Sequence, residues 1–95
     1  MSIWNITITA PTGAFDATLE INSELPEPTG EMRAKAGSGP MQGLKFSSDT
    51  IEWTTKIERP MPMKLTFKGN HGDGAMSGTV KFGIFASGTF TGTQA

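Results

Sequence analysis

The stretch from Met63 to Phe82 constrains the fold more than any other part of this 95-residue chain. Residues 63–68 and 76–82 each alternate apolar with polar side chains, and a segment rich in Gly, Asn and Asp, residues 70–74, separates them. Alternation with a period of two is typical of a strand with one buried face. Gly, Asn and Asp tolerate the backbone angles of a chain reversal. The sequence therefore predicts a β-hairpin at this place.

The same alternation recurs along the rest of the chain. The 12 Gly and 6 Pro residues divide it into short segments, and no window repeats apolar residues at helical spacing over three turns. This pattern is typical of an all-β sandwich or barrel. Residues 37–40 are expected to form a turn, and a β-bulge at Gly43 is expected because that residue interrupts its strand. The expected strands are residues 2–9, 14–22, 29–36, 41–46, 51–58, 63–68, 76–82 and 83–91.

The charged residues support this register. Every Asp, Glu, Lys and Arg inside an expected strand lies on the side opposite the apolar residues, and a slip of one residue would reverse the whole set. Strands with one apolar face each can bury that face by closing into a barrel, which also removes exposed edges. We therefore predict a single domain, residues 1–95, folded as an eight-stranded antiparallel up-and-down β-barrel in which the last strand pairs with the first. A two-sheet sandwich is the alternative.

Composition narrows the range of functions. The chain has no Cys, which excludes disulfides, thiolate metal sites and cysteine nucleophiles. The 8 Lys and Arg residues balance 9 Asp and Glu residues and do not cluster along the sequence, so neither nucleic acid nor a membrane is expected as a partner. The N-terminus has no signal-peptide pattern, and a cytoplasmic protein is expected. No cofactor and no metal site are expected, and a homo-oligomer is left open.

The N-terminal residues Ser2, Ile3 and Trp4, followed by consecutive hairpins, resemble the start of the calycin group of barrels, which includes lipocalins and avidins. Those families usually have Gly where this chain has Ser2. The resemblance implies a calycin-like barrel. The C-terminal third, from Met61 to Thr93, is also similar to small bacterial β-barrel domains and implies no particular activity.

The candidate ligand site is the barrel interior. Eight strands enclose a space just wide enough for side chains to fill or for one small ligand to occupy. The inward residues combine aromatic rings and methionines with small residues, so the interior either packs solidly or leaves an apolar hollow for a small hydrophobic molecule. Around such a hollow we expect an apolar wall, an internal hydroxyl and a basic residue that orients a polar group on the ligand. These residues are Trp4, Trp53, Met63 and Phe67 for the wall, Thr55 for the hydroxyl and Arg59 for the basic group.

Two other functions compete with a ligand-binding barrel. A cofactor-free isomerase, cyclase or lyase would use the same cavity, but it needs an acid or base inside. An inward Glu52, Glu58, Asp16 or His71 would favour that enzyme. A barrel with a filled core would instead act through its surface, and an outward Phe85 on the last strand would favour that protein-interaction module.

His71 is the only histidine and the default general acid or base at neutral pH. It is expected in the hairpin turn beside Asp73, in contact with solvent. Two ligands in such a turn would leave most of a metal coordination sphere to water. The sequence therefore assigns His71 no catalytic or metal-binding role.

Overall fold

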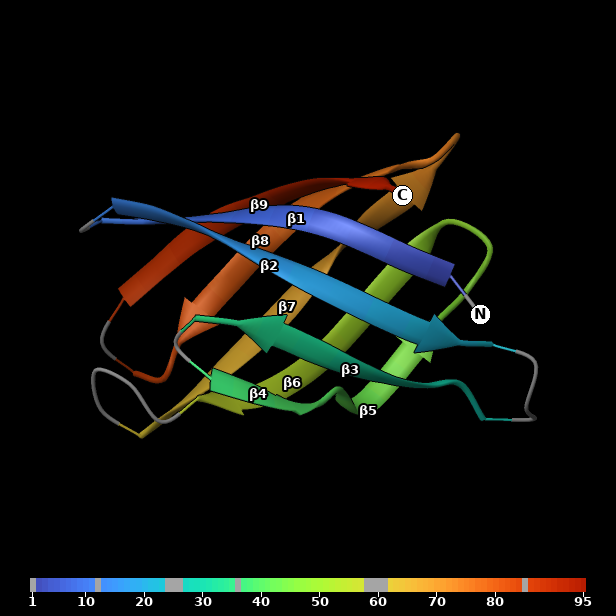
Figure 1. Cartoon of the computed structure of the whole chain (residues 1–95). Helices are drawn as coiled ribbons and strands as arrows, with labels where there is room; N and C mark the ends of the chain where they lie inside the picture. The colour runs from blue at the N-terminus through green and yellow to red at the C-terminus, as the bar shows by residue number, and fades with distance from the viewer. Residues whose placement is uncertain (1, 12, 24–26, 36, 58–61, 85) are drawn as a thin grey trace.

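A computed structural model describes the chain except residues 1, 12, 24–26, 36, 58–61 and 85 (Figure 1). The described part is 34 Å long and 21 Å wide, and its regular elements are all strands. The strands are β1 (Ser2–Ala10), β2 (Gly13–Asn22), β3 (Thr29–Ala34), β4 (Gly37–Pro40), β5 (Gln42–Phe46), β6 (Thr50–Ile57), β7 (Met63–Gly72), β8 (Ala75–Phe82) and β9 (Ala86–Gln94).

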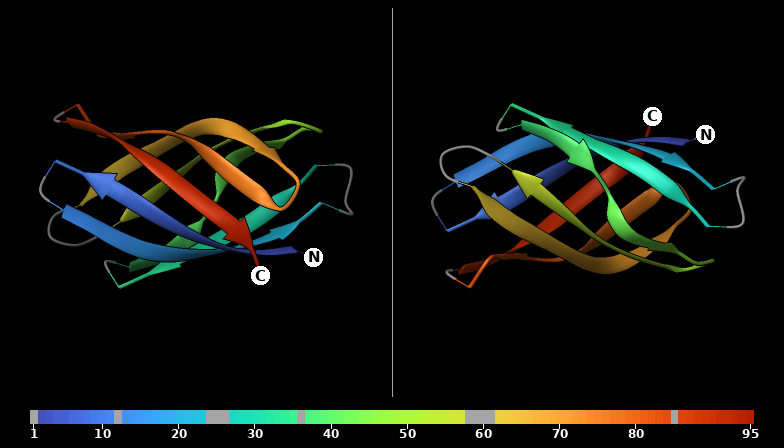
Figure 2. Two further views of the ribbon diagram at one scale, coloured as in Figure 1. Left: turned by 90° about the horizontal axis from the view of Figure 1, so that it is seen from above. Right: turned by 90° about the horizontal axis from the view of Figure 1, so that it is seen from below.

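These strands form one antiparallel sheet that curls into a nearly closed barrel (Figure 2). The order across the sheet is β4, β3, β2, β1, β9, β8, β7, β6, β5. Successive strands pair as hairpins except β4 and β5, which are the two edges of the sheet, and β9 pairs with β1, with Thr7 opposite Thr91. The predicted antiparallel barrel and the predicted pairing of the last strand with the first are both confirmed.

The count of nine strands in place of eight comes from the segment 37–46. Residues 37–40 were predicted to be a turn, and this prediction is wrong because they pair with β3 as strand β4. The chain then bends at Met41, which is buried and whose N–H donates to the Gly30 carbonyl over 2.8 Å, and continues as β5 along β6. One bent segment thus pairs with each side of the sheet in turn. The predicted bulge is confirmed, since the β5–β6 register shifts between Gln42 and Lys45.

The seam of the barrel lies between β4 and the second half of β6. The Thr55 side chain is fully buried there, and its hydroxyl donates to the Pro40 carbonyl at 3.3 Å. Since this bond connects two strands that are not neighbours in the sheet order, it helps to hold the seam together. The hydroxyl that the sequence offered to a ligand therefore already has a partner within the protein.

Replacing Thr55 by Val is expected to lower the free energy of unfolding by about 1 kcal/mol, because it deletes this hydrogen bond and keeps a side chain of similar shape. Urea denaturation measures the change. Thr54→Val on the neighbouring, partly exposed position of β6 is the control and should leave stability nearly unchanged. Equal stability of the two variants would contradict a role for Thr55 in the seam.

The core follows the predicted alternation. Among the described residues, the buried set is apolar apart from Thr55, and the charged residues lie outward. The register of the last strand is confirmed for Ala86 and Phe90, which face the core. Alternation over the expected last strand, residues 83–91, would also place Ile84 inward, but Ile84 lies in the turn before β9 with 95% of its surface exposed. The main buried side chains are Trp4, Ile6, Ile8, Leu19, Ile21, Met32, Ile51, Trp53, Leu65, Phe67, Met76, Val80 and Phe90.

Candidate functional site

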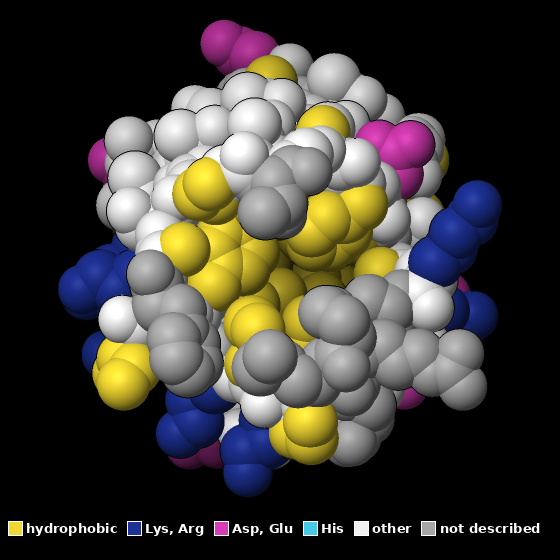
Figure 3. All heavy atoms as spheres, turned by 90° about the vertical axis from the view of Figure 1, so that its left-hand side faces the viewer, with side chains coloured by type: hydrophobic (Ala, Val, Ile, Leu, Met, Phe, Trp, Pro, Cys, Tyr) yellow, Lys and Arg dark blue, Asp and Glu magenta, His cyan; other side chains and the backbone are white. Residues whose placement is uncertain are grey.

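One end of the barrel opens as a shallow apolar hollow, which we call the mouth. It lies where β1, β3, β6 and β8 finish and β2, β4, β7 and β9 begin, at the left of Figure 1. Figure 3 looks into this end and shows hydrophobic side chains lining a depression. Among the described residues, five partly exposed apolar residues that pack against the core sit at these strand ends, and we call them the rim of the mouth: Ala10, Phe15, Ala34, Met63 and Ala86.

Basic residues flank the mouth on one side. A hollow of about 220 Å³ lies between the end of β6 and the start of β7. Its lining combines the apolar Ile57 and Met63 with Pro62 and the exposed Lys56 and Lys64. Such a lining suits a molecule with an apolar body and a polar or anionic end.

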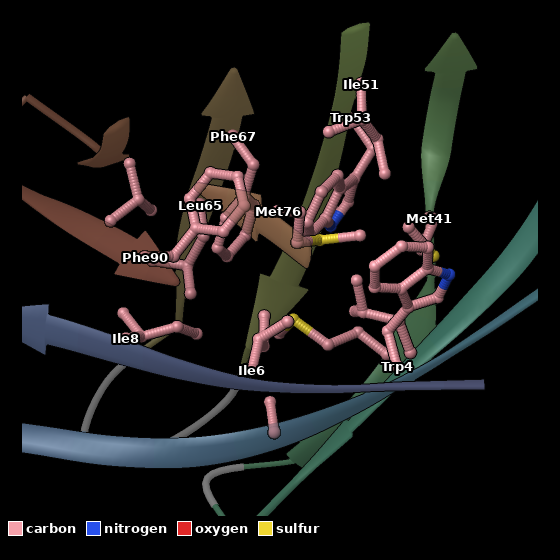
Figure 4. Close-up of a cluster of buried hydrophobic side chains, with 14 of the residues drawn as sticks. Trp4, Ile6, Ile8, Met41, Ile51, Trp53, Leu65, Phe67, Met76 and Phe90 are labelled. Carbon is pink, nitrogen blue, oxygen red and sulfur yellow. The ribbon is translucent and has the colours of Figure 1, made fainter. Parts of the chain in front are cut away.

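Three aromatic rings fill the middle of the barrel beneath the mouth. Trp53 and Phe67 stack with ring centroids 4.2 Å apart, and Phe90 meets them edge-on at 5.6 and 5.4 Å. All three side chains are at most 2% exposed (Figure 4). We call these three rings the floor: they fill the barrel below the mouth, and because they are almost fully buried, the open part of the mouth ends above them.

The six ligand-binding residues predicted from the sequence do not meet at one place. Trp53 and Phe67 are in the floor, and Met63 is on the rim of the mouth. Trp4 contacts His71 at the opposite end of the barrel, which we call the far end. Arg59 lies outside the described residues. Sequence reasoning missed the rest of the rim, because which strand ends meet depends on how the barrel closes.

The position of His71 corrects the sequence prediction. The turn was expected at residues 70–74, but β7 continues to Gly72 and places His71 opposite Met76. The reversal needs only Asp73 and Gly74, whose φ angles of 52° and 77° suit a two-residue hairpin turn. His71 therefore lies on the inward row of β7 and reaches the far end of the barrel.

The His71 ring closes the far end. It stacks on Phe46 with centroids 4.3 Å apart and meets Trp4 edge-on at 6.2 Å. Its Nε2 lies 2.6 Å from the Ser47 carbonyl, and because a carbonyl only accepts, Nε2 carries the proton and donates. The His71 backbone N–H also donates to the Asp49 carbonyl over 3.0 Å. These contacts tie β7 to the link between β5 and β6.

An ion-pair network connects β2 and β3 on the outside of the barrel. The Arg33 guanidinium contacts the carboxylates of Glu31 at 2.9 Å and Glu20 at 3.0 Å. The hydrogen bond to Glu31, and then the charges of Glu20 and Glu31, raise the pKa of Arg33 above its ordinary value. Arg33 thus relieves the repulsion between two glutamates that face each other across β2 and β3.

A groove of about 520 Å³ runs over the outer wall of β2, β1 and β9. Its lining is mostly Thr and Asn side chains, and the Thr7 hydroxyl donates to Asp16 at 3.0 Å. Within the described residues, no three His, Asp or Glu side chains gather in a way that could hold a metal ion. The mouth, with its exposed apolar lining, is therefore the best candidate for a binding site.

Comparisons with protein families, with curated proteins and with solved structures gave no match to this chain. The described residues contain no helix with the length and apolar character needed to cross a membrane.

Proposed function

We propose that this protein binds a small apolar or amphipathic molecule in the mouth of its barrel. The observation that carries the proposal is the rim of five partly exposed apolar residues at one end of the barrel. Such side chains remain in contact with water unless another molecule covers them, and covering them is favourable by about 25 cal/mol per Å² of apolar surface. A ligand that enters the mouth supplies this cover.

The binding site is the mouth and not the whole interior. A ligand of ordinary size cannot share the middle of the barrel with the stacked rings of Trp53, Phe67 and Phe90. Its apolar part packs above these rings, against Ile57 and Met63, and the flexible thioether of Met63 adapts to ligands of different shape. A polar end remains at the rim, near Lys56 and Lys64.

Titration with an environment-sensitive apolar dye and a panel of hydrophobic small molecules, followed by tryptophan fluorescence, tests this proposal. Trp53 lies in the floor, so one-to-one saturable quenching is expected. Ala86→Phe is expected to weaken binding at least about tenfold, because the added ring occupies the mouth. The same change should not lower the melting temperature, because the ring fills a hollow.

Ala75→Phe is the matched control, because Ala75 is exposed on β8 at the far end of the barrel. It should bind the dye as the wild type does. A folded wild-type protein that gives no saturable response would overturn the proposal. Equal binding by both Phe variants would show that the dye binds elsewhere.

The two alternatives from the sequence gain less support. His71 is inward, which was the condition that favoured an enzyme, but its ring packs on Phe46 and its Nε2 is engaged by Ser47 at the far end. The described residues of the rim carry no acid or base. Phe85, on which the protein-interaction module depended, lies outside the described residues. The meander of hairpins that begins with Trp4 in β1 supports a calycin-like identity as part of this proposal.

A further inference from the structure

An exposed apolar residue projects beyond the mouth. Ile84, in the turn between β8 and β9, has 95% of its surface exposed, whereas Ile3, the other exposed large hydrophobic residue among those described, has 41%. The exposed Pro11 and Pro62 lie on the chain links next to other strands at the same end. An isoleucine that is 95% exposed contributes little to the stability of the barrel, and its apolar surface is accessible to another molecule.

Four lysines that are separated in the sequence lie around this end of the barrel. Lys56 and Lys64 lie directly opposite each other across β6 and β7, and Lys81 lies on β8 opposite Thr66. Lys35 follows the end of β3 at the same end of the barrel. All four are exposed, and no carboxylate among the described residues forms an ion pair with them. We call these four residues the lysine cluster.

Repulsion within the lysine cluster lowers the stability of the fold. Like charges directly opposite each other on neighbouring strands repel, as Lys56 and Lys64 do. At the far end, by contrast, opposite charges are paired, for example Lys68 with Glu52 at 3.7 Å. The nearest described carboxylate to the mouth along the strands is Asp16, which accepts a hydrogen bond from Thr7. The repulsion is relieved when an anionic surface approaches this end.

The far end has the opposite charge. Of the described acidic residues, all except Asp16 lie in the links at the far end or in the half of a strand that is nearer the far end. The barrel is therefore polarised along its 34 Å axis, and an anionic surface attracts the mouth end and repels the far end. These acidic residues are Glu20, Glu27, Glu31, Asp49, Glu52 and Asp73.

We propose that the mouth end docks onto a lipid bilayer that contains anionic lipids. Ile84 enters the boundary between headgroups and acyl chains, and the lysine cluster contacts the lipid phosphates around it. A bilayer fits these features because its anionic headgroups lie above an apolar interior. The projecting isoleucine can reach this interior while the lysines around it contact the headgroups. The surface inference does not depend on the proposed ligand, although docking in this orientation would turn the mouth toward the membrane.

This inference departs from the expectation that the protein has no membrane partner. That expectation rested on the dispersed charges of the linear sequence. The fold gathers four of the lysines at one end and places most carboxylates at the other, which the sequence could not reveal before the strand order was known. A cytoplasmic location, expected from the sequence, would bring this end to a leaflet with negative surface potential.

Sedimentation of the whole chain with vesicles tests the docking. We expect binding to phosphatidylcholine vesicles that contain about 30 mol % phosphatidylglycerol and much weaker binding to pure phosphatidylcholine. Raising the salt concentration from about 0.05 M to about 0.5 M should remove most of the binding, because the Debye length falls severalfold. Ile84→Ser should weaken binding, whereas Ile3→Ser, on the outer face of β1, should not.

A pair of charge-matched variants separates the lysine cluster from net charge. Lys56→Glu with Lys81→Glu should weaken vesicle binding about 25-fold or more, because each lysine near an anionic surface contributes about fivefold. Lys45→Glu with Lys68→Glu changes the net charge equally, but at exposed sites away from the mouth, and should have a much smaller effect.

Absence of binding to phosphatidylglycerol vesicles at low salt would overturn the docking proposal. Equal losses in the two charge pairs would also overturn it, because net charge and not the lysine cluster would then govern binding. The dye titration is carried out without vesicles, and Ile84 is not one of the rim residues, so Ile84→Ser should not change dye binding. A result against docking is therefore distinguishable from a result against the ligand site.

Discussion

Replacing Gly78 by Ala is expected to lower the free energy of unfolding by about 3 kcal/mol or more. Gly78 faces inward on β8, directly opposite Gly69 on β7. An added Cβ would lie 2.1 Å from the Lys68 carbonyl oxygen and 2.5 Å from the Gly69 Cα. Both are backbone atoms, so no side-chain rotation relieves the contact. The strands must move apart, which breaks part of the pairing between β7 and β8.

Gly72→Ala in the same hairpin is the matched control. An added Cβ there meets nothing within 4 Å, and the residue is exposed. This change should leave stability equal or raise it by about 0.5 kcal/mol, because Ala restricts the unfolded chain. Urea denaturation of both variants compares them directly. A Gly78→Ala protein as stable as Gly72→Ala would mean that β7 and β8 are not so close.

Gly69 and Gly78 are part of the reason that the barrel has a solid middle. Both lie on inward rows, Gly69 beyond Phe67 on β7 and Gly78 opposite Phe90 on β9. Because they bring no side chain, the strands approach closely and the large rings occupy the space that remains. The alternation expected over residues 76–82 places Gly78 on the inward face. Gly69 was missed, because the strand was ended at residue 68, before the glycine and polar residues that usually mark a turn.

The strands and their faces were predictable because one buried face per strand forces an alternation that is visible in single residues. The errors arose where residue types that favour turns lie within regular strands. Residues 37–40, Gly-Ser-Gly-Pro, form β4, and His71 extends β7. In both segments cross-strand pairing outweighs the local preference of Gly, Pro and Asn for turns.

The candidate site was predictable only in part. Met63 lies on the rim of the mouth, and Trp53 and Phe67 lie in the floor. All three were predictable as inward residues, because their strands alternate clearly. The assignment of Trp4 to the same wall required knowledge of its height along the barrel axis. Trp4 stands near the start of β1 and therefore at the far end, which follows from the strand order and not from the alternation. The lysine cluster was invisible for the same reason.

Replacing Trp53 by Ala is the other change with a large expected effect, a loss of about 3–5 kcal/mol in the free energy of unfolding. The indole is 2% exposed, stacks on Phe67 at 4.2 Å and meets Phe90 edge-on. Its removal deletes these contacts and leaves a cavity that the surrounding strands cannot close without distortion. Chemical denaturation followed by circular dichroism measures the loss. Nearly unchanged stability would show that the inward register of β6 is wrong.

Trp53→Phe distinguishes the contribution of the ring from that of the polar nitrogen. The indole Nε1 is buried without a hydrogen-bond partner among the described residues. An unsatisfied buried donor costs about 1–3 kcal/mol, and phenylalanine removes this donor while it keeps a ring against Phe67. The smaller ring also loses some packing, so the two effects oppose each other. We therefore expect Trp53→Phe to cost no more than about 1.5 kcal/mol. A loss as large as that of Trp53→Ala would contradict this account, because the phenyl ring would then recover none of the packing that the indole provides.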